Sequence, residues 1–266
     1  MMPDPAIATA ERTDAARLLI ARSQMETVDL VTVSALELCV FDGPRQPVFE
    51  GVVAHAWMQV SDRRRRSLTE EVTSGLARRG LLVDDQAPRV SGGRSYSFAP
   101  ELGLMLAARS RPAFVVVAAG QAEGLRPMNL FALGDQAEPV QGIVVELPAA
   151  LPPDRDASFA KARKLGPLGW IYRYVLVSPG SAAEMLARWT IGAPAQRGGS
   201  ESPRYLVSAY RPDRDTPVGY HLAIQGDGNR AVVNGLGGGS DAVAGAAYDL
   251  GGLSTVMLGL LTQAAR

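Results

Sequence analysis

Three short apolar segments separated by turn residues constrain the fold of this chain more than any other feature. They are Phe114 to Ala118, Met128 to Leu133 and Gly142 to Leu147, and Gly, Pro and acidic residues stand between them. Apolar runs this short, bounded by such breakers, are typical of β-strands. Because they follow one another closely, the sequence predicts an antiparallel meander.

A second group of strand-like segments lies in the last third of the chain. It contains Tyr205 to Tyr210, Gly219 to Gln225 and Arg230 to Val233. The last two segments flank Gly226-Asp227-Gly228-Asn229, which is a suitable sequence for a hairpin turn. Shorter or single strands are expected at 81–83, 96–98 and 170–177.

Helices are expected between and after these strands. The clearest covers about 62–79, because Leu68, Val72 and Leu76 recur every fourth residue, Ser61 is a plausible N-cap, and Gly80 can end the helix. Other helices are expected at about 8–24, from Pro100 to before Pro112, from the capping-box pattern Ser181-Ala182-Ala183-Glu184 to about Thr190, and at about 250–261. The segments 28–41 and 48–60 are ambiguous between strand and helix.

The order helix, strands, helix recurs in each half, which predicts an α+β protein and allows a pseudo-duplicated architecture. The segment Pro148 to Asp156 resembles a linker. It divides an N-terminal half, residues 1–148, from a C-terminal half, residues 149–266. We expect the two halves to form one compact domain.

Composition excludes several classes of protein. Lys plus Arg is 27 and Asp plus Glu is 27, so the net charge is zero, which argues against a dedicated nucleic-acid binder. Cys39 is the only cysteine, so no intrachain disulfide forms. No secretory signal is visible, and no apolar stretch approaches the roughly 20 residues that span a bilayer. These features predict a cytoplasmic protein without a membrane partner.

No catalytic constellation can be assembled from the sequence. His55 and His221 are the only histidines, and no G-x-S-x-G elbow occurs. Cys39 lies in an apolar run, where a buried hydrophobic role is expected. We therefore predict a protein without catalytic residues that is not an enzyme. A site formed from dispersed residues stays open as an alternative.

The sequence also contains no metal-binding or phosphate-binding motif with the required spacing of residues. Asp213 and Asp215 form an Asp-x-Asp pair and Asp227 lies in a Gly-rich turn, but the calcium-loop pattern is absent. The run Gly235-Leu236-Gly237-Gly238-Gly239-Ser240 has no following Lys, and Asp241 would repel phosphate. We expect neither a metal nor a cofactor, and the sequence does not indicate a small-molecule ligand.

The strongest charge feature is the run Arg63, Arg64, Arg65 and Arg66 at the start of the helix expected at 62–79. These arginines are a solvated face, a phosphate-binding feature, or a site for an acidic partner. The helix with the strands near 81–98 resembles the last helix and wing of a winged-helix domain. That hypothesis needs a preceding helix pair, which the sequence does not show clearly.

Four stretches resemble the EspG family, the cytosolic chaperones of mycobacterial type VII secretion and their actinobacterial relatives. They are Val33-Ser34-Ala35-Leu36-Glu37-Leu38, Leu76-Ala77-Arg78-Arg79-Gly80-Leu81, Glu101 to Leu106 followed by Arg111-Pro112, and Gly219-Tyr220-His221-Leu222 with the segments 230–233 and 250–261. The segments 150–170 and 235–248 have no counterpart.

This resemblance implies a central twisted antiparallel sheet, helices on its faces and a quasi-two-fold relation between halves. It also implies a non-enzymatic chaperone that holds a helical secreted protein by its apolar tip. No residue-level binding motif of the family transfers to this chain, so the predicted partner-binding residues, Arg63 to Arg66, rest on their charge alone. The alternative is a winged-helix regulator that uses Arg63 to Arg66 on phosphate.

Overall fold

The protein is described from a computed structural model that covers residues 5–41, 50–85, 95–121, 125–134, 140–150, 163–192, 204–211, 221–235 and 245–265. Its helices are α1 (Pro5–Ser23), α2 (Ala35–Phe41), α3 (Gly51–Met58), α4 (Asp62–Arg78), α5 (Pro100–Ser110), η1 (Arg163–Gly169), α7 (Pro179–Ile191) and α8 (Leu250–Ala264). Its strands are β1 (Val28–Ser34), β2 (Leu82–Asp85), β3 (Ser95–Phe98), β4 (Val115–Gly120), β5 (Met128–Leu133), β6 (Gly142–Ala149), β7 (Ile171–Val177), β8 (Arg204–Tyr210), β9 (His221–Gly226), β10 (Ala231–Gly235) and β11 (Ala246–Tyr248).

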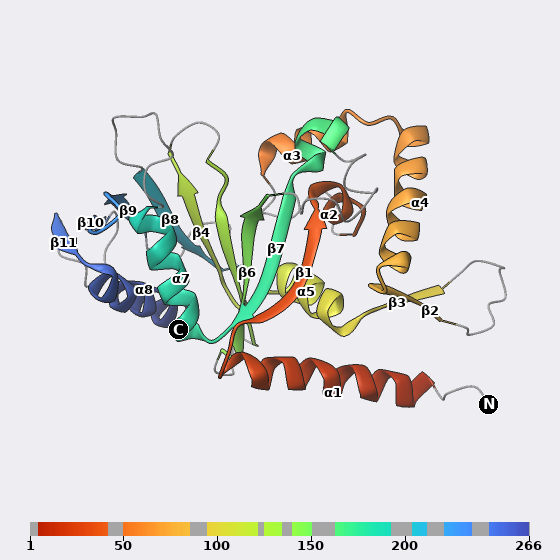
Figure 1. Cartoon of the computed structure of the whole chain (residues 1–266), viewed down its shortest axis with the longest axis horizontal. Helices are drawn as coiled ribbons and strands as arrows, with labels where there is room; N and C mark the ends of the chain where they lie inside the picture. Colours follow the sequence, from red (N-terminus) through yellow and green to blue (C-terminus); the bar gives the residue numbers. More distant parts are fainter. Residues whose placement is uncertain are drawn as a thin grey trace. The chain divides into compact units, whose positions relative to one another are not determined.

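Nine of the strands form one sheet in the order β1-β7-β6-β5-β4-β8-β9-β10-β11, and β2 and β3 form a separate hairpin (Figure 1). The meander predicted from the first three apolar segments is confirmed, since β5 pairs antiparallel with both β4 and β6. Strand β8 pairs with the other side of β4, in the register Val116↔Ala209. The α+β class, with a large antiparallel sheet flanked by helices, is therefore confirmed.

The chain divides into two compact units that are interleaved along the sequence. Unit 1 consists of Met1–Leu19, Leu30–Ser110 and Pro148–Tyr174, and unit 2 consists of Ile20–Asp29, Arg111–Leu147 and Val175–Arg266. The predicted halves, 1–148 and 149–266, stay a prediction. Residues 151–156 of the predicted linker lie outside the described part of the chain.

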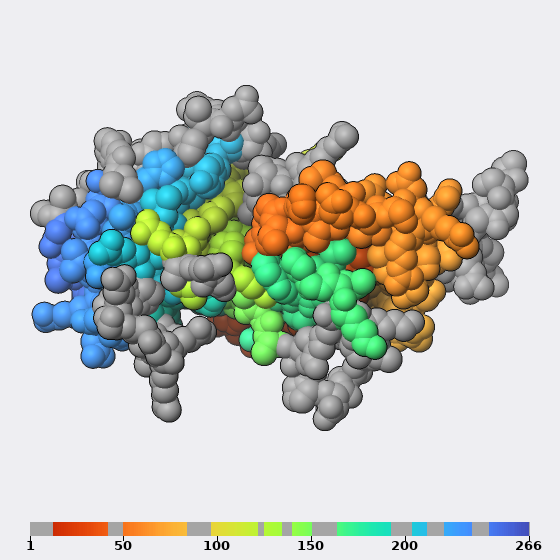
Figure 2. All heavy atoms as spheres, turned by 90° about the horizontal axis from the view of Figure 1, so that it is seen from above, coloured from red at the N-terminus to blue at the C-terminus, as the bar shows by residue number. Residues whose placement is uncertain are grey.

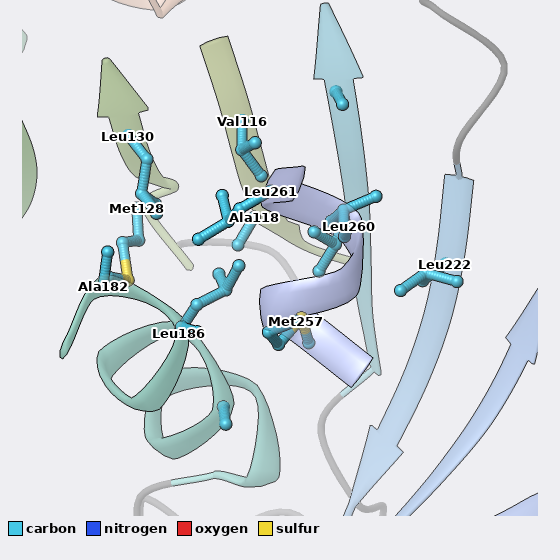
Figure 3. Close-up of a cluster of buried hydrophobic side chains, with 14 of the residues drawn as sticks. Val116, Ala118, Met128, Leu130, Ala182, Leu186, Leu222, Met257, Leu260 and Leu261 are labelled. Atoms are coloured by element: carbon cyan, nitrogen blue, oxygen red, sulfur yellow. The ribbon is translucent and has the colours of Figure 1, made fainter. Parts of the chain in front are cut away.

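The core of unit 2 lies between one face of its strands and the helices α7 and α8. Alternate residues along β4, β5 and β6 belong to this core, as the two-residue period of a strand requires, and examples are the buried Val116, Leu130 and Val145. Leu186 of α7 and Met257 of α8 meet them from the helical side (Figure 3).

Unit 1 is organised around the junction between β1 and α2. Ser34 Oγ accepts a hydrogen bond from the Glu37 N–H at 3.2 Å, and Glu37 Oε2 accepts one from the Ser34 N–H at 2.6 Å. These reciprocal bonds form a capping box that begins α2. At its other end, Phe41 packs edge-on against Phe98 of β3, with ring centroids 5.5 Å apart.

Several elements differ from the sequence-based expectations. The helix expected to begin at Ser181 begins at Pro179, because Ser178 is the N-cap and its hydroxyl accepts from the Ser181 N–H. The capping box predicted at Ser181 is therefore wrong, and Glu184 instead pairs with Arg188 at 2.6 Å. The ambiguous segment 48–60 contains α3, the segment 28–41 divides into β1 and α2, and η1 and β11 were not predicted.

Candidate functional site: a groove along helix α4

Helix α4 begins and ends close to where its sequence pattern predicts. Its buried residues Leu68, Val72 and Leu76 lie on one face. At its C-terminal end, the Leu81 N–H binds the Leu76 carbonyl at 2.9 Å and the Gly80 N–H binds the Ala77 carbonyl at 3.0 Å. This is a Schellman motif, which explains why Gly80 has φ 71°. Ser61 is the N-cap residue but makes no side-chain cap bond.

The four arginines at the start of α4 have different environments. Arg65 donates from Nη2 to the carbonyls of Trp57 at 3.2 Å and Met58 at 2.9 Å, and its guanidinium lies 5.6 Å from the Trp57 ring centre. It therefore binds the C-terminal carbonyls of α3, which is a structural role. Arg63, Arg64 and Arg66 are exposed.

A groove runs between α4 on one side and α2 and η1 on the other, all within unit 1. Its volume is about 650 Å³. The lining residues are Leu36, Glu37, Arg64, Ser67, Leu68, Glu70, Glu71, Val72, Ser74, Gly75, Arg78, Lys164 and Leu165. In Figure 2 the orange surface of α3 and α4 and the green surface of η1 lie side by side. Of the four predicted partner-binding arginines, Arg64 alone lines this groove.

The groove has an apolar floor and a charged rim. Leu36, Leu68 and Val72 are buried beneath it. Along the α4 wall, the carboxylates of Glu70 and Glu71 lie between Arg64 and Arg78, and exposed Lys164 stands on the η1 wall. A groove of this composition suits a segment with one apolar face and charged flanks.

Glu37 connects the groove to the rest of unit 1. Besides capping α2, its Oε1 accepts from Arg79 Nη1 at 2.7 Å, and Arg79 Nη2 donates to the Thr32 carbonyl of β1. The Glu37 side chain is 5% exposed and that of Arg79 is 20% exposed. This pair holds the end of α4 against β1 and α2. The pair was not predicted from the sequence, although the spacing Ser34-x-x-Glu37 is a capping-box signal.

Cys39, His55 and His221 are not among the residues that line the groove. Cys39 is buried and His55 is exposed. His221 Nδ1 lies 2.7 Å from Ser208 Oγ, in a directly opposed pair of β9 and β8. Asp213, Asp215 and residues 236–241 lie outside the described residues.

Asp227 has a turn-forming role. Its Oδ1 accepts from the N–H groups of Arg230 at 2.7 Å and Asn229 at 2.8 Å. These backbone bonds, that of Arg230 first, hold the pKa of Asp227 below its ordinary value. The predicted hairpin turn at this position is confirmed, because β9 and β10 pair antiparallel on either side of it.

The described residues contain neither a cluster of side chains that could hold a metal ion nor a helix that could cross a membrane. Within the ranges that the structure describes, no three His, Cys, Asp or Glu side chains gather to hold a metal ion. None of the described helices has the length and apolarity needed to cross a membrane.

Comparisons with known proteins give no match. No family model matches the chain, and neither the curated proteins nor the solved structures include a significant match to it.

Proposed function

We propose that this protein is a non-enzymatic, cytoplasmic binding protein that docks a helical protein segment in the α4 groove, as a chaperone or adaptor of a secreted helical substrate. The observation that carries the proposal is the groove itself, with its apolar floor and its rim of both charges. The resemblance to type VII secretion chaperones supports the same class of partner.

The length of the groove along α4 suits a helical peptide segment. Its lining residues on α4 extend from Arg64 to Arg78. At 1.5 Å per residue this wall is about 21 Å long, which equals about four helical turns of a partner. A partner that buries an apolar stripe there would be protected from aggregation through that stripe.

The arginines at the start of α4 add a second argument. Cations near a helix N-terminus oppose the helix dipole, each by about 0.3–1 kcal/mol. Arg65 offsets this cost by binding α3. The exposed Arg63, Arg64 and Arg66 make no such contact with α3. Cations at a helix N-terminus that bring no structural gain are typical of a functional site.

The test is capture of a helical secreted protein encoded beside the gene, by co-expression and pull-down. Ser74→Arg places a bulky side chain at an exposed position of the groove lining, and Thr69→Arg places the same side chain at an exposed position of α4 outside it. We expect Ser74→Arg to abolish capture and Thr69→Arg to retain it. Equal capture by both variants, or no capture of any such protein by the unmodified chain, would refute the proposal.

A second candidate is DNA binding. Only residues 59–61 separate α3 from α4, and the β2–β3 hairpin follows α4, as in a winged-helix arrangement. Against it, Glu70 and Glu71 lie one to two turns beyond the arginines on the same helix and would repel phosphate. Retention on DNA at low salt that is lost in Arg63→Ala/Arg66→Ala would favour this function over docking.

A further inference from the structure

Three charged residues stand at heptad intervals along the groove wall. Arg64, Glu71 and Arg78 are seven residues apart in sequence, and all three line the groove. Positions seven residues apart on an α-helix drift by only about 20°, so the three side chains form one row along α4. At 1.5 Å per residue, neighbouring charges in this row are about 10 Å apart.

A second row lies beside the charged one and is uncharged. Leu68 and Gly75 are also seven residues apart, and both are buried. Gly75 adds no side chain to the floor. An apolar row flanked by a charged row at the same period is the arrangement by which paired helices select their partners, since the flanking charges set register and exclude wrong sequences.

The charges of the row are only weakly engaged with each other. Arg64 Nη1 lies 3.8 Å from Glu71 Oε1, and the two side chains are 52% and 40% exposed. Ion pairs this long and this exposed contribute little to stability. For Arg64, exchanging that contact for one with a partner therefore costs little.

We propose that the segment bound in the groove is a single amphipathic helix that carries an acidic, a basic and an acidic residue at heptad spacing beside its apolar stripe. This inference rests on the proposed docking function and names the partner's chemistry. Acidic residues face Arg64 and Arg78, and the basic residue faces Glu71. A second copy of α4 does not satisfy this row in centred register, because its own plus, minus, plus order would place like charges opposite one another.

The test uses three fluorescein-labelled helical peptides with the same apolar stripe. Their flanks carry acid–base–acid, base–acid–base or three Gln residues at heptad spacing. Anisotropy titrations at low salt should give about tenfold tighter binding of the acid–base–acid peptide than of the base–acid–base peptide, and the difference should shrink at high salt. The variant Arg64→Glu/Glu71→Arg/Arg78→Glu should reverse this preference.

A matched control uses Arg66→Glu, which changes the net charge by the same two units at an exposed position outside the groove lining. It should keep the original preference, and circular dichroism should show both variants folded. Equal affinity for all three peptides overturns the charge pattern and leaves groove docking intact. No binding of any peptide, together with unaltered partner capture by Ser74→Arg, overturns both proposals. A dimer in sedimentation that the charge-reversed variant loses would assign the groove to a second copy and refute the inference.

Discussion

A close backbone approach at Gly226, in unit 2, predicts that Gly226→Ala is severely destabilising. A Cβ at Gly226 would lie 2.7 Å from the Cα of Ile191 and closer still to the Ile191 carbonyl. Ile191 ends α7, and its carbonyl accepts a hydrogen bond from the Gly228 N–H at 2.9 Å. The β9–β10 turn is thus fixed directly against the end of a core helix, with no space for a side chain.

The expected loss of stability is the sum of two costs. Overpacking of a filled site costs about 1–3 kcal/mol. Moving the turn away from α7 also lengthens or breaks the Gly228 to Ile191 hydrogen bond, which contributes about 1 kcal/mol. The free energy of unfolding should therefore fall by about 2–4 kcal/mol.

Urea unfolding followed by circular dichroism measures this loss. Gly259→Ala is the matched control, because Gly259 lies inside α8 and an added Cβ there has nothing within 4 Å. Replacing a helical glycine by alanine should raise the free energy of unfolding by about 0.5–1 kcal/mol. If Gly226→Ala unfolds at the same urea concentration as the unmodified protein, the packing of this turn against α7 is not as described.

Three further tests, two in unit 1 and one in unit 2, probe contacts within each unit. Arg65→Ala should lower the free energy of unfolding by about 1–2 kcal/mol through loss of the α3 carbonyl contacts, whereas Arg66→Ala should change it by less than about 0.5 kcal/mol in the same urea titration. Glu37→Ala should cost about 3 kcal/mol, and the double variant with Arg79→Ala should cost clearly less than the sum of the single changes; additive costs would show that the pair is not coupled. Because the folded-state pKa of Asp227 is lowered, its contribution is present above its unfolded pKa of about 3.9 and is lost as the pH falls through the folded value. Asp227→Asn should therefore flatten the acid side of the stability–pH curve, and an unchanged curve would contradict the turn hydrogen bonds.

Much of the fold could be predicted because periodicity and turn chemistry act locally. The strands of the meander and the helix α4 follow from apolar spacing and from Gly80, whose Schellman motif depends on neighbouring residues only. The hairpin at Asp227 follows from its turn residues for the same reason. The element η1 could not be predicted in this way, because it is short, contains Pro167 and is interrupted at Leu165 and Gly166.

Competition between equivalent local signals explains the error at α7. Ser181-x-x-Glu184 matches a capping box, but Ser178 followed by Pro179 also matches a helix start, and the structure uses the second. At Ser34 the opposite error occurred: the capping box is present in the structure, next to a strand, but was not predicted. Its Glu37 also binds Arg79, which is 42 residues away, and no local pattern reports that contact.

The candidate site was predicted only in part for a similar reason. The run Arg63 to Arg66 lies on the helix that lines the groove, but the sequence alone does not distinguish the four arginines from one another. Their separation into a residue that binds α3, one that lines the groove and two exposed side chains depends on α3 and on the position of the groove wall. The heptad row from Arg64 to Arg78 was visible in sequence, but without the opposite wall nothing distinguished it from a solvated face.

The interleaving of the two units has a consequence for how the chain is made and degraded. Each unit is assembled from three separate segments, so no continuous stretch contains one unit without parts of the other. During synthesis, unit 1 lacks its last segment until Tyr174 has emerged, by which time two of the three segments of unit 2 are already present. Unit 1 can therefore be complete while unit 2 still lacks its last segment, but unit 2 cannot be completed before all of unit 1 has been made. A single cut by a protease in any loop between segments would divide at least one unit, so we expect nicked protein to be lost as a whole.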